Sequence, residues 1–488
     1  MKKPFYITTT LPYVNSNPHI GFALEIIRAD MIARYKQSQG FDVFFNTGTD
    51  EHGAKIQQKA QEAGVSTQSY VDQYAEKFKA LGGMLGLSSD INFIRTTDTH
   101  HVAAAQEFWR QCKERGFIYK KNYSVKYCIG CELEKTESEL TEGMCPLHPN
   151  MELERISEEN YFFAFSKFQK QLLDLYSANP DFVVPPSRQN EIRAFVERGL
   201  DDFSISRLVS KMSWGIAVPD DAEHVMYVWF DALVNYISAI GWPTDMKKFN
   251  RFAIDTGGMI QYCGKDNLRQ QAAMWQAMLC AVGLPNSKQI VIDGFITGAG
   301  GVKMSKSLGN TIEPTEILKE YDKDVLRYYM AREIHPFEDS EFTMEKFKAS
   351  YNANLANGLG NLVSRVLKMA ETYGVRIPEA LLGAGDTENH INNYPIIRES
   401  LDTYRLDRAL DEIWKMIGEA DAFVQKNEPF KKIKIDKEGA EADVAHLLAS
   451  VFTIANLLEI FLPDTAEKIK TAIREGKALS VPLFMRKA

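Results

Sequence analysis

Residues 5–22 read FYITTTLPYVNSNPHIGF, and this stretch decides the fold. Its first half is rich in aromatic and β-branched residues, which predicts a buried strand, and VNSNP predicts a turn. A helical pattern then runs from about His19 to Gln39 and stops at Gly40. A strand that turns directly into a helix is the opening of a parallel α/β unit.

The same order of elements repeats further along the chain. FDVFFNTG, residues 41–48, predicts a second strand, and a helix follows from about His52 to Ala63. MIQYCG and KQIVIDGFIT predict two more strands, separated by a helix over 267–282, and the second of them leads into a lysine-bearing loop. We therefore predict a Rossmann-type parallel sheet, in which ligands bind beyond the carboxyl ends of the strands.

Shifts in composition divide the chain into regions. Clustered cysteines, PDFVVPPSRQ and acidic runs interrupt the α/β pattern, which suits an inserted domain, and helical patterns alone follow after about residue 345. We expect, in chain order, the first half of the α/β domain (1–117), the inserted domain (118–222), the second half of the α/β domain (223–296), a loop region (297–345) and an α-helical bundle (346–488).

Size and charge limit the class of protein. A chain of 488 residues is long enough for several domains. Its net charge of −8 argues against a surface coated in positive charge for binding nucleic acid. The N-terminus lacks the apolar run of a signal peptide, and the most apolar later stretch, 447–462, contains Glu459 and is shorter than a membrane-spanning helix. We expect a cytoplasmic protein that binds no membrane.

Three of the six cysteines lie close together. Two residues separate Cys128 from Cys131, and two residues separate Cys145 from His148. These paired short spacings are typical of a zinc knuckle, and four ligands leave no open position, so we expect one structural Zn²⁺. The alternative is unrelated thiols beside a surface histidine. The remaining cysteines are expected to be ordinary buried residues: Cys112, Cys263 and Cys280.

Two motifs point to a polyphosphate. His19 lies where a loop enters a helix N-terminus, a place that favours phosphate, and Gly21 allows close approach. This motif alone could equally mark a capping or buried histidine. GAGGVKMSKSLGN, residues 298–310, places Lys303 and Lys306 on a glycine-rich loop that can close over phosphates, although two such lysines alone are common on solvated surfaces. The two motifs together indicate a polyphosphate site far more specifically than either motif does alone.

PHIGF and KMSKS resemble the two signature motifs of class I aminoacyl-tRNA synthetases. TTTLPYVNSNPHIG, TGTDEHG, YVWFDALVNYISA, GKDN and ANLANGLGNLVSR are similar, in order and spacing, to the methionyl-tRNA synthetase family, over about residues 7–430. The resemblance implies that ATP and L-methionine form methionyl-adenylate and pyrophosphate, and that the methionyl group passes to the terminal adenosine of tRNA(Met), including the initiator. It also implies a connective role for the inserted domain and a stem-contact role for residues 297–345.

The resemblance assigns roles to individual residues. The catalytic residues would be His19, Lys303 and Lys306, acting with Mg²⁺ on the charge that develops at the α-phosphate. The same three residues would bind ATP together with Gly21, Gly264 and Asp266. Methionine needs an apolar slot of some aromatic character. The residues on the matching positions are Leu11, Tyr13, Asp50 (for the ammonium group), Arg207, Trp229, Ala232, Leu233, Tyr236, Asn267 and Gln271. Without the resemblance, we would assign the aromatic residues among them to a plain core.

Three departures from the family pattern lie near these positions. Phe22 stands where the nucleotide motif usually has a histidine, so one imidazole donor is absent and we expect re-routed nucleotide contacts. Asn267 replaces an apolar residue and Gln271 replaces a histidine, and both are expected to face the methionine side chain. Gln271 could hydrogen-bond the sulfur or Tyr13.

In the helical region, Asn361 and Arg365 match positions that read anticodon bases. Phe430 stands where the family has tryptophan, so a stacking face is kept and the indole N–H is lost. The lysines that follow could contact phosphate or form a solvated face: Lys431, Lys432 and Lys434. The end of the chain near 488, without a further oligonucleotide-binding domain, suggests a monomer.

Three other readings compete with this one. Synthetases for leucine, isoleucine or valine carry a larger editing insertion, and the cysteine enzyme holds zinc at its amino-acid pocket. A second alternative is a catalytically idle paralogue that binds tRNA or a nucleotide as a regulator. Phe22 alone favours this interpretation, whereas His19 and Asp50 argue against it because an idle protein does not need them. A small nucleotidylyltransferase shares the His-x-Gly logic but would lack the helical domain.

Overall fold

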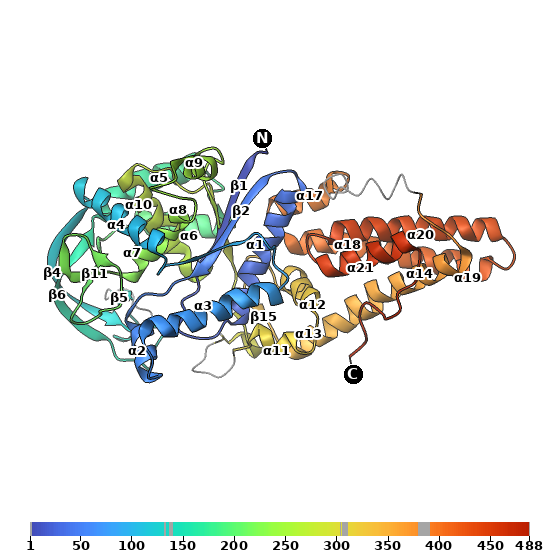
Figure 1. Ribbon diagram of the computed structural model, residues 1–488, viewed down its shortest axis with the longest axis horizontal. Helices are drawn as coiled ribbons and strands as arrows, with labels where there is room; N and C mark the ends of the chain where they lie inside the picture. Colours follow the sequence, from blue (N-terminus) through green and yellow to red (C-terminus); the bar gives the residue numbers. More distant parts are fainter. Residues whose placement is uncertain are drawn as a thin grey trace.

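The computed structural model describes residues 2–130, 133–135, 140–302, 304, 311–378 and 391–487. Figure 1 shows an α/β part and a helical bundle at opposite ends of an elongated molecule, with α12 and α13 between them. A six-stranded sheet in the order β3-β2-β1-β12-β13-β7 forms the centre of the α/β part, and all of its neighbouring strands run parallel. The Rossmann-type prediction is therefore confirmed.

The first half of the sheet follows the predicted order, because each element is set by local sequence. Its elements are β1 (Pro4–Thr9), α1 (Ile20–Ser38), β2 (Asp42–Thr49), α2 (Ala54–Glu62), α3 (Thr67–Met84), β3 (Asn92–Arg95) and α4 (Thr99–Glu114). The chain moves outward from β1 to β3 in this half, and the second half begins on the other side of β1 with β12. The carboxyl ends of β1 and β12 therefore form the switch point at which ligands bind in such sheets.

The region after α4 contains two smaller antiparallel sheets, β5-β4-β6-β8 and β10-β11-β9. Its elements are β4 (Ile118–Cys128), β5 (Leu133–Lys135), β6 (Glu154–Phe163), η2 (Phe165–Phe168), α5 (Gln169–Ala178), β7 (Val183–Val184), α6 (Pro186–Glu197), β8 (Phe203–Ser204), β9 (Ser206–Leu208), β10 (Ala217–Val218) and β11 (Asp221–Met226). The expectation that 118–222 forms a separate insertion needs correcting at β7, because Val183 and Val184 pair with β13 in the main sheet.

The helices in the second half of the α/β part are shorter than predicted. Its elements are α7 (Val228–Leu233), α8 (Asn235–Ser238), α9 (Met246–Phe249), η3 (Asn250–Ile254), β12 (Ile260–Gly264), η4 (Lys265–Asn267), η5 (Gln270–Met274), α10 (Trp275–Val282) and β13 (Gln289–Asp293). The helix expected over 267–282 is thus a 3₁₀ turn, a π-helical turn and an α-helix in succession.

The strand expected over KQIVIDGFIT is two strands. β13 ends at Asp293, and Ile296 and Thr297 pair instead with Ser340 and Glu341 in a separate sheet. The break lies at Gly294, where the backbone of Glu338 approaches so closely that a Cβ would collide with its carbonyl oxygen. The elements of this region are β14 (Ile296–Thr297), η6 (Ala299–Gly301), α11 (Pro314–Leu318), α12 (Lys323–Tyr328), η8 (Tyr329–Glu333) and β15 (Ser340–Glu341).

The rest of the described chain is helical, as predicted. Its elements are α13 (Met344–Ser350), η9 (Tyr351–Gly360), α14 (Asn361–Tyr373), α17 (Pro395–Asp402), α18 (Leu406–Asn427), α19 (Pro429–Lys432), α20 (Lys437–Leu458) and α21 (Pro463–Glu475). The amphipathic helices α14, α18 and α21 and the more apolar helix α20 pack around a common core. Helix α20 is apolar and long enough to cross a membrane by length and composition, unlike the shorter stretch 447–462, but its large apolar side chains are buried in the bundle.

Two buried arginines join the parts of the molecule. Arg28, in the middle of α1, forms an ion pair with Asp293 at 2.9 Å and donates to the carbonyl groups of Met330 and Pro336. Arg327, on α12, forms an ion pair with Asp30 of α1 at 2.8 Å. Its guanidinium also donates to the carbonyl groups that precede α21, those of residues 460 and 461. Helix α1 therefore connects the sheet, the region around α12 and the bundle.

Candidate active site

His19 caps helix α1 at the carboxyl end of β1. Its Nδ1 accepts a hydrogen bond from the backbone N–H of Gly21 at 3.1 Å. A Cβ on Gly21 would lie 3.0 Å from the imidazole, so glycine lets the ring fold over the first turn. Because Nδ1 accepts, the proton of a neutral imidazole is on Nε2. The ring is exposed and can present this N–H to an anion at the helix N-terminus.

The chain that follows the lysine loop lies against this helix start. The N–H of Ile20 donates to the carbonyl of Ile312 at 3.0 Å, and the amide of Asn17 donates to Glu313 at 3.0 Å. Lys303 and Lys306 lie outside the described residues. The segment that begins at residue 311 thus lies beside the start of α1, and the convergence of the two lysines on His19 stays a prediction.

The two segments expected to bind methionine meet directly. Tyr13 and Asp50 form an isolated parallel bridge, in which Val14 donates to the carbonyl of Asp50 at 3.1 Å and Asp50 donates to the carbonyl of Pro12 at 3.0 Å. Leu11 and Tyr13 are half-buried. The loop after β1 and the loop after β2 therefore form one continuous wall at the switch point.

A second wall comes from α7 and α8. Trp229 and Ala232 are three residues apart and lie half-exposed on one face, whereas Leu233 is buried in the core. Tyr236 is buried, and its hydroxyl oxygen accepts a hydrogen bond from Nε2 of Gln271 at 2.7 Å. Burial raises the pKa of Tyr236 well above its usual value, so this phenol stays neutral.

The two departures from the family pattern in GKDNLRQQ, Asn267 and Gln271, have different partners in the structure. Gln271 is buried, and its amide bridges the hydroxyl of Tyr236 and the side chain of Gln261, the latter at 2.6 Å. Asn267 is half-buried in the 3₁₀ turn and donates to Asp266 at 3.3 Å. Gln271 is therefore held behind Tyr236, and the partner of Asn267 is Asp266, a residue expected to bind the nucleotide.

Arg207 lies in β9, whose partner strand β11 leads into α7. The guanidinium is buried, donates to Ser204 Oγ at 2.7 Å and to the carbonyl of Ser206 at 2.8 Å, and lies over the ring of Tyr227. This arginine is held rigidly, as a group that positions other charges must be.

Sequence reasoning missed Glu25. This carboxylate is buried in α1, where Oε1 accepts hydrogen bonds from the backbone N–H of Thr10 at 2.7 Å and from its hydroxyl at 2.6 Å. Burial raises the pKa of Glu25 to about 8, and the charges of Asp293 and Asp266 add to the rise. The signal was an acidic residue inside the apolar run of residues 20–27.

The glycine and the carboxylate expected to hold the nucleotide lie at the same edge. Gly264 ends β12, and Asp266 follows it in the 3₁₀ turn at the carboxyl end of the sheet. A Cβ on Gly264 would lie 2.8 Å from Oδ1 of Asp266, so glycine leaves room for this carboxylate in its present position. Phe22, by contrast, turns inward, where its buried ring packs edge-on against Phe78 at 5.1 Å.

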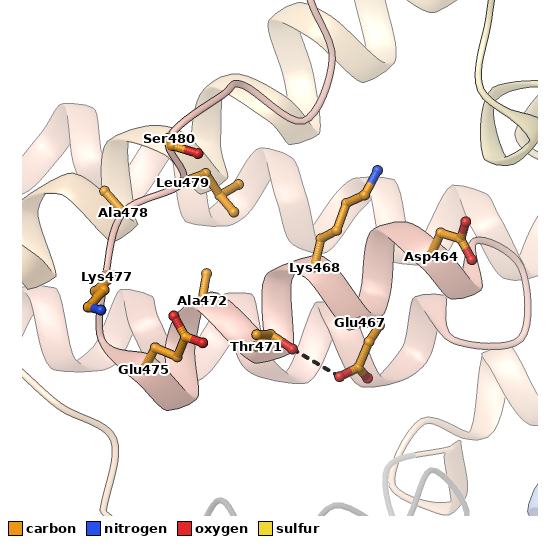
Figure 2. A pocket seen from close by; sticks show the side chains of 10 residues that line it. All are labelled: Asp464, Glu467, Lys468, Thr471, Ala472, Glu475, Lys477, Ala478, Leu479 and Ser480. Carbon is orange, nitrogen blue, oxygen red and sulfur yellow. Dashed lines mark hydrogen bonds between the residues drawn. The ribbon is translucent and has the colours of Figure 1, made fainter.

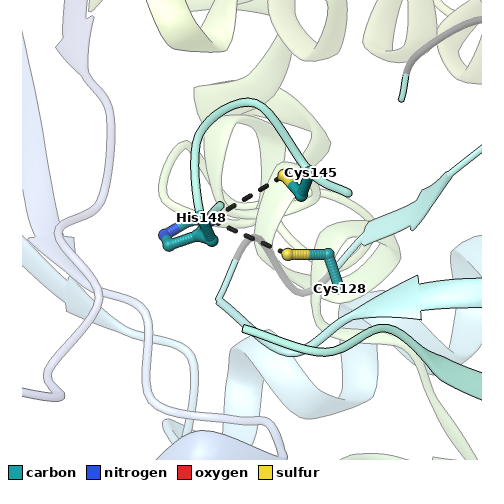
Figure 3. Close-up of side chains that lie close together, drawn as sticks. All are labelled: Cys128, Cys145 and His148. Atoms are coloured by element: carbon teal, nitrogen blue, oxygen red, sulfur yellow. Dashed lines mark hydrogen bonds between the residues drawn. The ribbon is translucent and has the colours of Figure 1, made fainter. Parts of the chain in front are cut away.

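The described part of the cysteine cluster fits a tetrahedral metal. Sγ of Cys128 and Sγ of Cys145 lie 3.7 and 4.0 Å from Nδ1 of His148, which are separations expected between ligands of one Zn²⁺ ion (Figure 3). Gly130 allows the approach, because a Cβ there would overlap the imidazole of His148. Cys131 lies outside the described residues.

The residues expected to read the anticodon lie on the bundle. Asn361 begins α14 and is exposed, and Arg365, one turn later, forms an ion pair with Asp421 of α18 at 2.9 Å. Phe430 is 43% exposed, so its ring face is open to stacking. Two of the three neighbouring lysines form ion pairs within the protein, with Glu428 and Asp443.

A hollow of 620 Å³ also lies on the bundle, between α21 and the segment that follows it (Figure 2). Acidic and basic side chains alternate around it, including Glu467, Lys468 and Glu475. Because it belongs to the helical domain, it does not contribute to the site at the sheet.

Comparison with known proteins places this arrangement in a family. Residues 5–155 and 150–367 match the family described as tRNA synthetases class I (M), and residues 377–482 match the anticodon binding domain of methionyl tRNA ligase. A methionine–tRNA ligase of Thermotoga maritima is 41% identical over 477 residues, which are 95% of this chain and 74% of that protein. One from Thermosynechococcus vestitus is 40% identical over 481 residues, with 96% and 90% covered.

Solved structures agree with the sequence comparison. The Mycobacterium tuberculosis methionyl-tRNA synthetase in complex with methionyl-adenylate has a TM-score of 0.89 and 35% identity, with 100% of both chains covered. The free form of that enzyme gives 0.82 and 31% identity, with 100% of this chain and 99% of the other covered. The chain therefore belongs to the methionyl-tRNA synthetase family of class I aminoacyl-tRNA synthetases.

Proposed function

We propose that the protein is a methionine–tRNA ligase. It activates L-methionine with ATP to methionyl-adenylate and pyrophosphate, and it transfers the methionyl group to the 3′-terminal adenosine of tRNA(Met), including the initiator. The observation that carries this proposal is the meeting, at one switch point, of the His19 cap, the segment after the lysine loop and the Tyr13–Asp50 bridge. A nucleotide site and an amino-acid site there share one edge of the sheet.

In the first step, Asp50 binds the ammonium group of methionine, and the side chain enters the slot between Tyr13 and Trp229. A methionine carboxylate oxygen attacks the α-phosphorus, the bond from that phosphorus to the bridging oxygen breaks, and pyrophosphate leaves. The Nε2–H of His19 and the ammonium groups of Lys303 and Lys306 stabilise the negative charge of the transition state. Bound to the phosphates, Mg²⁺ would supply a counterion for their negative charge.

The thioether of methionine is recognised through its polarisability and by a fixed hydrogen-bond donor, the hydroxyl of Tyr236. Gln271 donates to the oxygen of Tyr236, so the phenolic hydrogen of Tyr236 points away from that amide and is directed to another acceptor. A thioether sulfur is a weak acceptor and packs well against aromatic edges. This supports a role for Tyr236, backed by Gln271, in selecting methionine over an aliphatic side chain of similar size.

In the second step, a ribose hydroxyl of the terminal adenosine attacks the carbonyl carbon of the adenylate, and AMP leaves. We propose that Asn361, Arg365 and Phe430 contact the anticodon, so that the bundle (346–488) and the stem-contact region (297–345) orient the tRNA across the molecule. We also propose that Cys131 completes a structural Zn²⁺ site with the three described donors, and that the protein acts as a cytoplasmic monomer.

The test is an exchange of labelled pyrophosphate into ATP, run with methionine and, in parallel, with leucine, isoleucine, valine and cysteine. We expect exchange that depends on methionine, followed by charging of a methionine tRNA transcript. Exchange with none of the amino acids would favour the idle paralogue. Exchange with leucine in place of methionine would mean that the pocket around Tyr236 and Gln271 selects another side chain.

A further inference from the structure

A buried contact between a histidine and an aspartate joins the two walls of the proposed methionine site. Nδ1 of His52 lies 3.3 Å from Oδ2 of Asp231. The two residues are 5% and 0% exposed, respectively. His52 belongs to the loop after β2, and Asp231 lies on α7, so the contact bridges segments far apart in the sequence.

Each partner lies two residues from a residue of the proposed site. Asp50, which would bind the ammonium group, precedes His52 on one wall, and Trp229 precedes Asp231 on the other. Asp231 is fully buried on α7, whereas Trp229 is half-exposed. The contact between His52 and Asp231 therefore fixes the distance between the two walls on their buried side.

His52 is the side chain that Asp231 faces. The nearby imidazole of His101 is buried, lies 2.9 Å from Ser238 Oγ, and has a pKa lowered by burial to about 3, so it is neutral. Among the residues that the structure describes, neither carboxylate oxygen of Asp231 makes a hydrogen bond, and the ion-pair contact is with His52 alone. A fully buried carboxylate depends strongly on such a partner.

The loop that carries Asp50 is also fixed on its other side. Glu51 is buried and accepts both of its charged hydrogen bonds from Arg95, at 2.7 and 2.9 Å, while its carbonyl accepts from the indole of Trp214 at 2.6 Å. Glu51 thus ties the loop to β3, and His52 ties it to α7. Asp50 is held between these two attachments.

We infer that His52 and Asp231 are positioning residues, which hold the ammonium-binding Asp50 at a set distance from the aromatic wall at Trp229. This inference rests on the proposed function. Asp50 and Trp229 both belong to the methionine part of the proposed site, so we expect the pair to contribute to methionine binding. A shift of the Asp50 loop by a fraction of an ångström lengthens a charged hydrogen bond to the substrate and weakens binding before it affects the chemical step.

The experiment measures methionine-dependent pyrophosphate exchange and the direct binding of methionine by calorimetry. We expect His52→Ala to raise the KM and the Kd for methionine about tenfold, with the KM for ATP and the kcat within about twofold of wild type. Asp231→Asn keeps the shape of the side chain and removes its charge, so it should raise the same two constants if His52→Ala fails to fold. In the double variant, the two effects should not add.

His224→Ala is the matched control. His224 is also buried beside a carboxylate, 3.1 Å from Asp221, but its other ring nitrogen meets the carbonyl of Glu159 and not a site residue. It should cost stability and leave the KM for methionine unchanged. An unchanged KM in both His52→Ala and Asp231→Asn, or an equal rise in His224→Ala, would overturn the inference. If the wild-type protein gave no exchange with methionine, the proposed function would fall, and the inference with it.

Discussion

Glu25 is a buried acid in a place where charge matters. The unfolded chain loses this proton near its ordinary pKa of 4.5, whereas the folded protein keeps it up to about pH 8. Between these values the folded state binds more protons, so its stability falls as the pH rises through that window and levels off above it. Both hydrogen bonds from Thr10 reach the same oxygen, Oε1, which a glutamine at this position also has.

Glu25→Gln therefore removes the titration and keeps the contacts. We expect the variant and the wild type to have similar stability at pH 5, and we expect the variant to be more stable at pH 8 by on the order of 3 kcal/mol. Urea unfolding of both proteins at pH 5, 6.5 and 8 measures this, because any titration of Asp293 is common to the two. Parallel stability curves across this range would show that the folded protein does not keep the proton of Glu25.

Single residues also show the limit of sequence reasoning. His19, Asp50 and Tyr236 follow recognisable motifs, so their neighbourhoods could be predicted. The partnership of His52 with Asp231 could not, because nothing in either segment indicates that one faces the other. The inward turn of Phe22 depends on Phe78, a residue of another helix, so the sequence suggested a lost nucleotide contact where the structure has a core contact.

Elements were predictable where local pattern determines them. β1, α1 and β2 lie close to their expected bounds, since period, turn residues and Gly40 all agree. β7 was missed because two residues carry no period, and its pairing with β13 is a tertiary event. The break between β13 and β14 depends in the same way on the approach of Glu338 to Gly294. β7 and the break after β13 were mispredicted because they are short or depend on tertiary contacts, and not because the residue propensities were misread.

The zinc knuckle is an element that a metal would hold together, because β5 has three residues and the segment around Cys145 has little regular structure. We expect about one zinc per chain in the wild-type protein and almost none after Cys145→Ser. Metal analysis after dialysis measures the content, and proteolysis should then cut first near residues 128–155. Cys280→Ser, at a half-buried thiol outside the cluster, is the control and should keep its zinc. Equal zinc content in both variants would contradict the proposed ligand set.

At the scale of the molecule, the anticodon-binding helices can place a tRNA correctly only if the bundle is held at a fixed position relative to the sheet. Arg327 is central to that position, since it contacts Asp30 on α1 and the carbonyl groups that precede α21. The guanidinium and the carboxylate are fully buried, so removing the arginine leaves Asp30 without its main interdomain partner. Arg332, by comparison, joins η8 to α18 of the bundle through a partly exposed ion pair with Asp411.

Arg327→Met should therefore separate the two steps of the reaction. The adenylate forms within the α/β part, so we expect pyrophosphate exchange to stay within about threefold of wild type, whereas the kcat/KM for tRNA charging should fall at least about tenfold, because the anticodon site moves relative to the catalytic centre. Arg332→Met should change both activities little. Assaying both reactions with each variant, at a temperature at which each is folded, makes the comparison. An equal loss of exchange and charging in Arg327→Met would mean that this arginine supports the fold as a whole and does not set the position of the bundle.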